Sequence, residues 1–179
     1  SGSLSLWMML DSESCANQVS GICSIFDIAG TGSNGLIMMI NNANRPFVQY
    51  GIGSGVTSAA ANPIIKGVWY HVVGTWDSSG GKIYVNGALE GTTTTSPLYT
   101  INQAFTFIGS NGGLNRFFNG TIDEVAVFDR ALNEVEVANY YNATKNSYNA
   151  KYNLALSGSR YEWNCLANDS DGFSNFADY

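Results

Sequence analysis

The chain has 179 residues, of which 45% are hydrophobic and only 12% are charged, and its formal net charge at pH 7 is -6. This length fits one or two domains, and the apolar fraction is sufficient for a sizeable core. The acidic balance and the lack of any Lys/Arg cluster argue against nucleic-acid binding, which requires cations that neutralise phosphates. No apolar run approaches the ~20 residues of a membrane-spanning helix, so we expect no membrane span.

Most of the chain up to Phe128 consists of short apolar or alternating runs separated by Gly- and Asn-containing turns. In chain order, the expected strands are Ser3–Leu10, Cys23–Ile28, Leu36–Ile40, Pro46–Tyr50, Trp69–Trp76, Lys82–Val85, Ala88–Glu90, Ala104–Gly109 and Gly120–Phe128. Many short, evenly spaced strands predict an all-β fold, an antiparallel β-sandwich. The clearest hairpin turn is Asn86-Gly87, because this pair accepts the positive φ angles of a type I′ turn.

One short helix is expected at residues 133–141. Asn133 can cap its first turn, and Glu134 and Glu136 lie near its positive end. Val135 would share an apolar face with Ala138 or Asn139.

The three cysteines are Cys15, Cys23 and Cys165. Cys15 and Cys23 flank a short polar loop between two strand-like runs, where a disulfide would fix the hairpin and two free thiols are the alternative. Cys165 has no evident partner. Glycosylation sequons at Asn119, Asn142 and Asn168 are compatible with a secreted protein.

Two segments carry a family resemblance: residues 67–91 read GVWYHVVGTWDSSGGKIYVNGALEG, and residues 107–141 read FIGSNGGLNRFFNGTIDEVAVFDRALNEVEVANYY. These words resemble the laminin-G-like, concanavalin-A-like jelly-roll family. The resemblance implies a jelly roll over residues 1–144 and an extracellular binding module instead of an enzyme. In that family a short helix follows the word Asp-Arg-Ala-Leu, found here at residues 129–132, so Arg130 is expected to pair with a carboxylate near the helix start.

The sequence pattern changes after the expected helix, and residues 145–179 are expected to form a second domain. The segment Tyr161–Gly172 resembles the late strands of immunoglobulin-like or fibronectin-like modules in microbial surface proteins. The jelly roll lacks the family's usual N-terminal strand, since the chain begins almost at the strand of Trp7. We therefore expect further domains of the same protein, or neighbouring copies, to complete the sheets.

Paired carboxylates on one strand face characterise glucanases of this fold, since a glycosidase needs an acid and a base or nucleophile. Strict alternation over residues 121–128 places Asp123 with Val125 and Val127, and Glu124 on the opposite face. This pattern predicts no glycosidase activity. The only histidine, His71, has a structural counterpart in the resembling family.

Asp123 resembles a position where many jelly rolls place a calcium-ligating aspartate, so the resemblance implies one structural calcium ion. Calcium prefers carboxylate and carbonyl oxygens. The alternative is that Asp123 accepts a hydrogen bond from neighbouring backbone.

Candidate ligand-binding residues lie in two polar loops, at Asn41–Arg45 and Asn111–Phe118, because loop side chains can exchange hydrogen bonds with sugar hydroxyls. They are Asn44, Arg45, Asn111, Asn115 and Arg116. Aromatic residues could also stack on sugar rings, although the core is the more frequent place for them; they are Trp7, Tyr50, Trp69, Trp76, Tyr84 and Tyr99.

Together these features predict a non-catalytic extracellular binding or adhesion module, a part of a larger microbial surface protein, whose partner is a glycan or an extracellular protein. Two alternatives stay open. One is a structural subunit of a surface layer or filament, completed by strands of neighbouring copies. The other is an accessory carbohydrate-binding module of a secreted glycoside hydrolase or lyase.

Overall fold

The computed structural model describes residues 1–11, 15, 19–28, 36–50, 56–94, 106–112, 115–145, 166–168 and 174–176. The chain divides by contacts into two compact units, Ser1–Asn149 and Ala150–Tyr179, each of which is described by itself. The expected domains 1–144 and 145–179 stay predictions.

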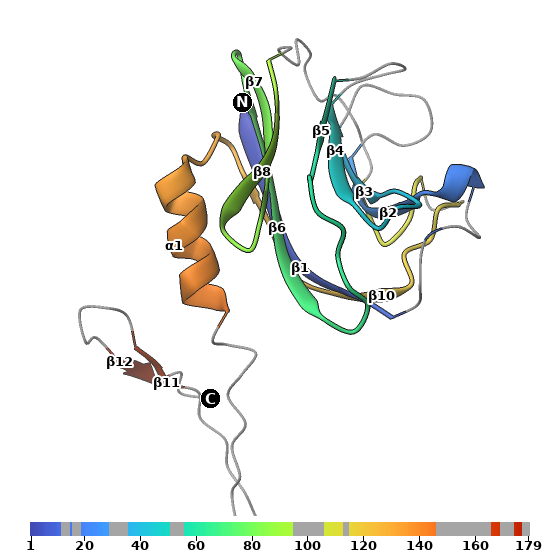
Figure 1. Ribbon diagram of the computed structural model, residues 1–179. Coiled ribbons are helices and arrows are strands. Elements are labelled where there is room, and N and C mark those ends of the chain that lie inside the picture. Colours follow the sequence, from blue (N-terminus) through green and yellow to red (C-terminus); the bar gives the residue numbers. More distant parts are fainter. Residues whose placement is uncertain are drawn as a thin grey trace, which may run out of the picture. The chain divides into compact units, whose positions relative to one another are not determined.

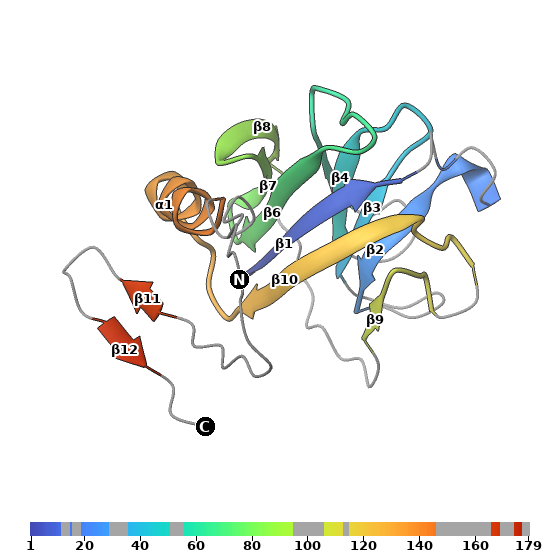
Figure 2. The same ribbon diagram turned by 90° about the horizontal axis from the view of Figure 1, so that it is seen from below.

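The first unit is an antiparallel β-sandwich of two five-stranded sheets (Figures 1 and 2), which confirms the predicted fold class. Sheet A contains, in spatial order, β10 (Gly120–Phe128), β1 (Gly2–Leu10), β6 (Trp69–Asp77), β7 (Gly80–Val85) and β8 (Ala88–Thr93). Sheet B contains β5 (Val56–Ala59), β4 (Pro46–Tyr50), β3 (Leu36–Ile40), β2 (Cys23–Asp27) and β9 (Phe107–Ile108).

The main core lies between the two sheets. Strand β1 contributes every second side chain to it, and these four are at most 1% exposed: Leu4, Leu6, Met8 and Leu10. From sheet B, residues such as Ile25, Met38 and Val48 pack into the same core. Each fully buried side chain of this size contributes about 1.5–3 kcal/mol. The period-two alternation of apolar residues is therefore what selects the inner face of each strand.

Strand β5 was not among the expected strands. It pairs with β4, with Ala59 opposite Phe47 and Ser58 opposite Val48. Residues 56–59 read VTSA and follow a Gly-rich segment, so their intrinsic strand signal is weak. Tertiary contacts with β7 and β8 position this strand instead.

Gly91 of β8 allows that close approach. A Cβ atom on this residue would overlap the carbonyl oxygen of Ala59. Nearby, the carboxylate of Glu90 accepts hydrogen bonds from the backbone and side-chain nitrogens of Asn62 at 3.0–3.2 Å. The β5 edge of sheet B is thus attached to the β8 edge of sheet A.

Helix α1 (Glu134–Thr144) covers the outer face of sheet A (Figure 1). Asn133 and Glu136 form a reciprocal capping box, which confirms Asn133 as the expected cap. Arg130 donates to the Glu136 carboxylate at 2.8 Å, which confirms the expected pairing.

The buried face of α1 differs from the expected one. Val135 is 68% exposed, whereas Val137 is fully buried. Val137, Tyr140 and Tyr141 follow the i, i+3, i+4 spacing of one helix face, and this aromatic face meets sheet A. A second, smaller core of Val73, Tyr84, Leu132 and Val137 results.

The hairpin turn between β7 and β8 has the expected form. Asn86 and Gly87 both have positive φ angles, 51° and 80°, as a type I′ turn requires.

In the second unit the structure describes only a pair of short strands, β11 (Leu166–Asn168) and β12 (Ser174–Phe176), with Leu166 opposite Phe176. The immunoglobulin-like resemblance of this unit stays a prediction, and Cys165 lies outside the described residues. Over the part of the chain that the structure describes, no helix has the length and apolarity to span a membrane.

Candidate functional site

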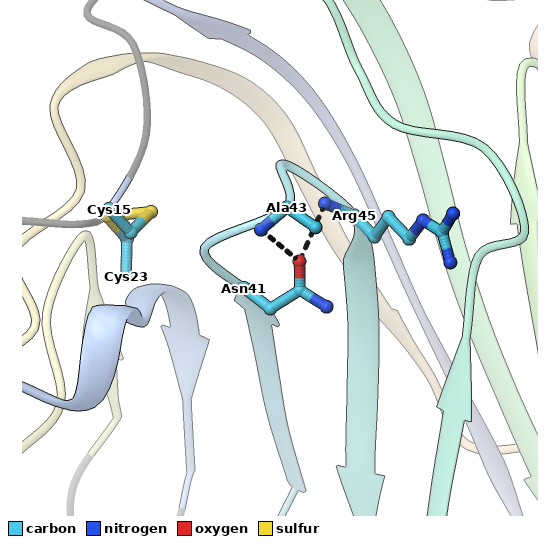
Figure 3. The surroundings of a disulfide bond; sticks show 5 residues. All are labelled: Cys15, Cys23, Asn41, Ala43 and Arg45. Atoms are coloured by element: carbon cyan, nitrogen blue, oxygen red, sulfur yellow. Dashed lines mark hydrogen bonds between the residues drawn. A yellow bond between two sulfur atoms is a disulfide. The ribbon is translucent and has the colours of Figure 1, made fainter.

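Cys15 and Cys23 form a disulfide, which confirms the first of the two alternatives for these residues (Figure 3). Both cysteines are buried, at 0% and 3% exposure. The short 3₁₀ turn η2 (Val19–Gly21) lies within the closed loop. A Cβ atom on Gly21 would lie 3.1 Å from Cβ of Asn42, so this loop packs closely on the turn that joins β3 to β4.

That turn contains two of the predicted ligand-binding residues, Asn44 and Arg45. The side-chain oxygen of Asn41 accepts from the amides of Ala43 and Arg45 at 2.9 and 3.1 Å (Figure 3), an Asx arrangement that fixes the turn. Asn44 has a φ of 56°, and its side-chain oxygen is buried. Arg45 is exposed, and its side chain extends away from the turn and from the disulfide.

The other predicted loop, which begins at Asn111, is fixed by hydrogen bonds to a buried carboxylate. Asp27 is fully buried at the end of β2, and its Oδ2 accepts from the Asn111 side chain at 3.0 Å and from the Gly112 amide at 2.9 Å. A buried carboxylate requires such donors. Asn111 is 9% exposed and therefore serves the loop. The side-chain oxygen of Asn115 is also buried.

Arg116 closes the same loop at the other end of β2. Its carbonyl accepts from the Ser24 amide at 2.7 Å, and its guanidinium lies 3.9 Å from the sulfur of Met39. Met39 lies one residue before the end of β3, so Arg116 and the Asn41–Arg45 turn occupy the same end of sheet B. We call Arg45 and Arg116 with this turn the arginine end. Asn111 lies at the opposite end of β2.

The aromatic candidates belong mostly to the interior. Trp7 stacks on Tyr141 of α1 at 5.8 Å between ring centroids, and its Nε1 donates to Thr144 at 3.0 Å. Tyr50 donates to the carbonyl of Thr75 at 3.0 Å, a buried hydrogen bond between the two sheets. Tyr84 is 1% exposed, and Trp76 packs against the main core. Trp69 is half-buried, and Tyr99 lies outside the described residues.

His71 is fully buried beneath α1, with its ring 5.3 Å from that of Trp7 and 5.6 Å from that of Tyr140. Burial lowers the pKa of His71 to about 4. The residue is therefore neutral at pH 7 and packs as a core side chain.

The expected alternation along residues 121–128 fails at a β-bulge between β1 and β10. Ser5 pairs with Ala126, but Trp7 pairs with Asp123, so β10 contains one extra residue in this interval. Glu124 adopts a φ of 47°, the left-handed backbone that a bulge of this kind uses.

Because of this bulge, Asp123 and Val125 do not share a face. Val125 packs against the main core, whereas Asp123 lies opposite Trp7 on the helix side of sheet A. Burial and the negative charge of Glu124 both raise the pKa of Tyr140 on α1. The expected grouping of Asp123 with Val125 on one face is wrong.

The calcium ion at Asp123 stays a prediction. One oxygen of Asp123 accepts from the Glu124 amide at 2.7 Å, the hydrogen bond that was the alternative. Within the described ranges, no three acidic, histidine or cysteine side chains gather as a metal group. Calcium takes about six to eight oxygens, so a site here would need carbonyl and water ligands besides the carboxylates.

A cleft of about 450 Å³ opens in sheet A where β6 turns into β7, beside the start of α1. Its polar lining includes Thr75, Asp77, Lys82, Thr92 and Asn133. Ala131 and Leu132 supply its apolar part.

One wall of the cleft depends on a glycine. Gly80 has a φ of 138°, and a Cβ atom on it would overlap the carbonyl oxygen of Thr93. Asp77 accepts from the hydroxyl and the amide of Ser79 at 2.5 and 2.7 Å, and these hydrogen bonds lower the pKa of Asp77.

Lys82 lies at the rim of the cleft. Its Nζ is 3.5 Å from the Glu134 carboxylate, in a pair whose side chains are 45% and 61% exposed. Such an exposed pair contributes little to stability, so Lys82 can exchange this partner for another.

Below the lining, the hydroxyl of Tyr84 is buried and forms no well-shaped hydrogen bond within the described residues. Burial raises the pKa of this tyrosine, against the opposing charge of the nearby Lys82.

No sequence motif predicted this cleft. Its residues come from three strands and a loop, and none belongs to a pattern with metal-ligand or catalytic spacing. The available signals were the hydroxyl run Thr92-Thr-Thr-Thr95 and the polar turn Asp77-Ser-Ser-Gly80, both of which also fit an ordinary surface.

Comparison with known protein families shows to which superfamily the chain belongs. A laminin-G-type model, described as the concanavalin A-like lectin/glucanases superfamily, matches residues 1–138. The chain belongs to this superfamily. It is also 35% identical over 83 residues to the human adhesion G-protein coupled receptor D1, a match that spans 42% of this chain and 9% of the receptor.

Solved structures share the fold. The sialidase CBM40 of Ruminococcus gnavus, bound to α2,3-sialyllactose, matches with a TM-score of 0.65 and 17% identity, over 78% of this chain and 82% of that one. The SAP-like pentraxin of Limulus polyphemus matches with a TM-score of 0.60 and 20% identity, over 76% and 67%. The Trypanosoma rangeli sialidase matches with a TM-score of 0.61 and 18% identity, over 80% of this chain but 23% of the enzyme.

Proposed function

We propose that this chain is a non-catalytic glycan-binding module that acts outside the cell. The observation that carries the proposal is the match to the sialyllactose-bound R. gnavus module, which extends over most of both chains. The disulfide between Cys15 and Cys23 supports an oxidising compartment. The chain also matches part of a receptor whose name refers to adhesion. This match supports a binding role over a catalytic one.

The arginine end is the proposed binding surface. Arg45 is exposed on a turn that the Asn41 side chain fixes, and Arg116 approaches from the neighbouring loop. Guanidinium groups donate several hydrogen bonds in a fixed plane, which suits sugar carboxylates and hydroxyls. Asn44, Asn111 and Asn115 would contribute by shaping these loops, since their side-chain oxygens or amides face inward.

A glycan array followed by calorimetry tests the proposal. We expect the 179-residue chain to bind at least one oligosaccharide, with 3′-sialyllactose and lactose as the first pair to compare. Arg45→Ala and Arg116→Ala should weaken binding about tenfold each, the loss of a charge-assisted hydrogen bond. Lys145→Ala, at the end of α1, is the matched control. Absence of binding to every glycan would reject the proposed function, whereas equal binding by all variants would reject the arginine end as its binding surface.

The non-catalytic part of the proposal rests on the relatives, because the bulge at Glu124 removes the pattern argument. We expect no release of reducing sugar from β-glucans or sialosides. Turnover that disappears in both Asp123→Ala and Glu124→Ala would contradict this.

A calcium ion at Asp123 and the attachment of this module to a longer surface protein remain proposals. A second candidate function is an accessory module of a secreted glycosidase, which the two sialidase matches favour. The domains adjacent to this segment in the full gene distinguish the candidates, since a catalytic domain would support the accessory role.

A further inference from the structure

We propose that the cleft beside the start of α1 is a second binding site, which takes an uncharged saccharide. This inference rests on the proposed glycan-binding function but concerns a different surface. The cleft lies on sheet A, whereas the arginine end belongs to the loops of sheet B.

The size and lining of the cleft fit a sugar ring. A volume of about 450 Å³ lies within the range of ligand pockets, about 300–1,000 Å³. Hydroxyl side chains project into it from different strands, with Thr75 on β6 and Thr92 on β8. Ala131 and Leu132 add a small apolar surface, which suits the C–H face of a pyranose. This combination of polar groups and an apolar patch is typical of saccharide recognition.

The charges of the cleft favour a neutral ligand. Lys82 and Asp77 line it together, so one positive and one negative side chain offset each other. Glu134 lies next to Lys82 at 3.5 Å and would repel an anionic group brought to the lysine. Asp77 already accepts hydrogen bonds from Ser79 and from the Gly80 amide, and a carboxylate with about four acceptor sites can also accept from a sugar hydroxyl.

Further polar groups lie around the lining. The hydroxyl of Tyr84 is buried close to Thr75 and Lys82, both of which line the cleft. The start of α1 adds polar groups, since Asn133 at its first turn lines the cleft.

Amide chemical shifts of the ¹⁵N-labelled chain test the inference, with lactose, cellobiose and maltose as neutral probes and 3′-sialyllactose as the anionic one. We expect a neutral sugar to shift the amides of Gly80, Gly81 and Thr92. Thr92→Val and Lys82→Met alter exposed or half-buried side chains and should keep the fold. Each should weaken this binding about fivefold, whereas Thr121→Val on β10 should leave it unchanged.

The outcomes separate this inference from the proposed function. Shifts at Gly80 and Gly81 that persist in Arg45→Ala support the cleft as an independent site. Sugar-dependent shifts confined to Arg45 and its neighbours overturn the cleft and leave the glycan-binding function intact. If only 3′-sialyllactose binds in the cleft, the proposal that its ligand is uncharged is overturned. No response to any of the four sugars counts against the cleft.

Discussion

The hydroxyl of Ser5 and Nε2 of His71 lie 2.8 Å apart beneath α1, where both residues are fully buried. Nδ1 of the same imidazole has no hydrogen-bond partner among the described residues. The rings of Trp7 and Tyr140 enclose the imidazole. The packing of α1 on sheet A therefore depends on an uncharged histidine.

This arrangement predicts that the protein loses stability as the pH falls below about 6.5. The pKa of His71 is about 4 in the folded protein and 6.5 in an unfolded chain. Between these values the unfolded state binds the proton and the folded state does not, so the free energy of unfolding falls as protons are added. At pH 5 the loss should be about 2 kcal/mol, rising to about 3 kcal/mol near pH 4.

Denaturant unfolding at pH 7 and pH 5 measures this loss. His71 is the only histidine, and the two carboxylates with lowered pKa, Asp77 and Glu136, titrate below this window. In His71→Gln the difference between pH 7 and pH 5 should nearly vanish, on a lower baseline of stability. An unchanged pH difference in that variant would show that another group is responsible.

The capping box of α1 predicts that Asn133→Ala destabilises the protein by about 1 kcal/mol. The side chain of Asn133 accepts from the Glu136 amide at 3.0 Å, and alanine leaves that donor without its partner. Asn139→Ala is the matched control, because Asn139 is exposed in the middle of the helix and alanine has the higher helix propensity. We expect opposite signs in thermal unfolding, and equal effects would exclude a capping role.

Much of the fold could be read from the sequence because its signals are local. The alternation of Leu4, Leu6 and Met8 selects the inner face of β1, and Asn86-Gly87 carries its own turn geometry. The disulfide could also be predicted from the sequence, since Cys15 and Cys23 are only eight positions apart.

The errors occur where a distant partner decides the structure. Alternation cannot reveal the bulge at Glu124, which depends on how β10 pairs with β1. The sequence did not reveal that Asn111 donates to Asp27, because this partner is 84 positions away in the chain. The cleft gathers Thr75, Thr92 and Asn133 from separate elements, and no local pattern joins them.

Close packing at the β5–β8 edge predicts a large effect of Gly91→Ala. The added methyl group would overlap the carbonyl oxygen of Ala59, and backbone cannot move aside as a side chain can. We expect a loss of at least about 1–3 kcal/mol in unfolding free energy. Gly67→Ala serves as the comparison, since nothing lies within 4 Å of its Cβ position although its φ is 72°. A smaller effect at Gly91 than at Gly67 would contradict the close approach of the two sheets.

Calcium binding at Asp123 predicts a metal-dependent melting temperature. Calcium that binds only the folded state should stabilise it by about 2.7 kcal/mol at a hundredfold excess over Kd, and EDTA should reverse this. Asp123→Asn should remove the effect, whereas Asp11→Asn should keep it. Identical melting with calcium and with EDTA would eliminate the ion from this position.

The disulfide between Cys15 and Cys23 predicts a loss of about 2–3 kcal/mol on reduction, because the covalent link restricts the unfolded chain around a short loop. Alkylation of the unfolded protein without reductant should modify one thiol, that of Cys165, and after reduction it should modify three. The double variant Cys15→Ala/Cys23→Ala should unfold at the midpoint of the reduced protein and should not respond to reductant. Because Gly21 of the closed loop packs on Asn42, reduction should also weaken glycan binding at the arginine end. Three reactive thiols before reduction would show that the bond does not form, and equal midpoints for oxidised and reduced protein would show that it does not stabilise the fold.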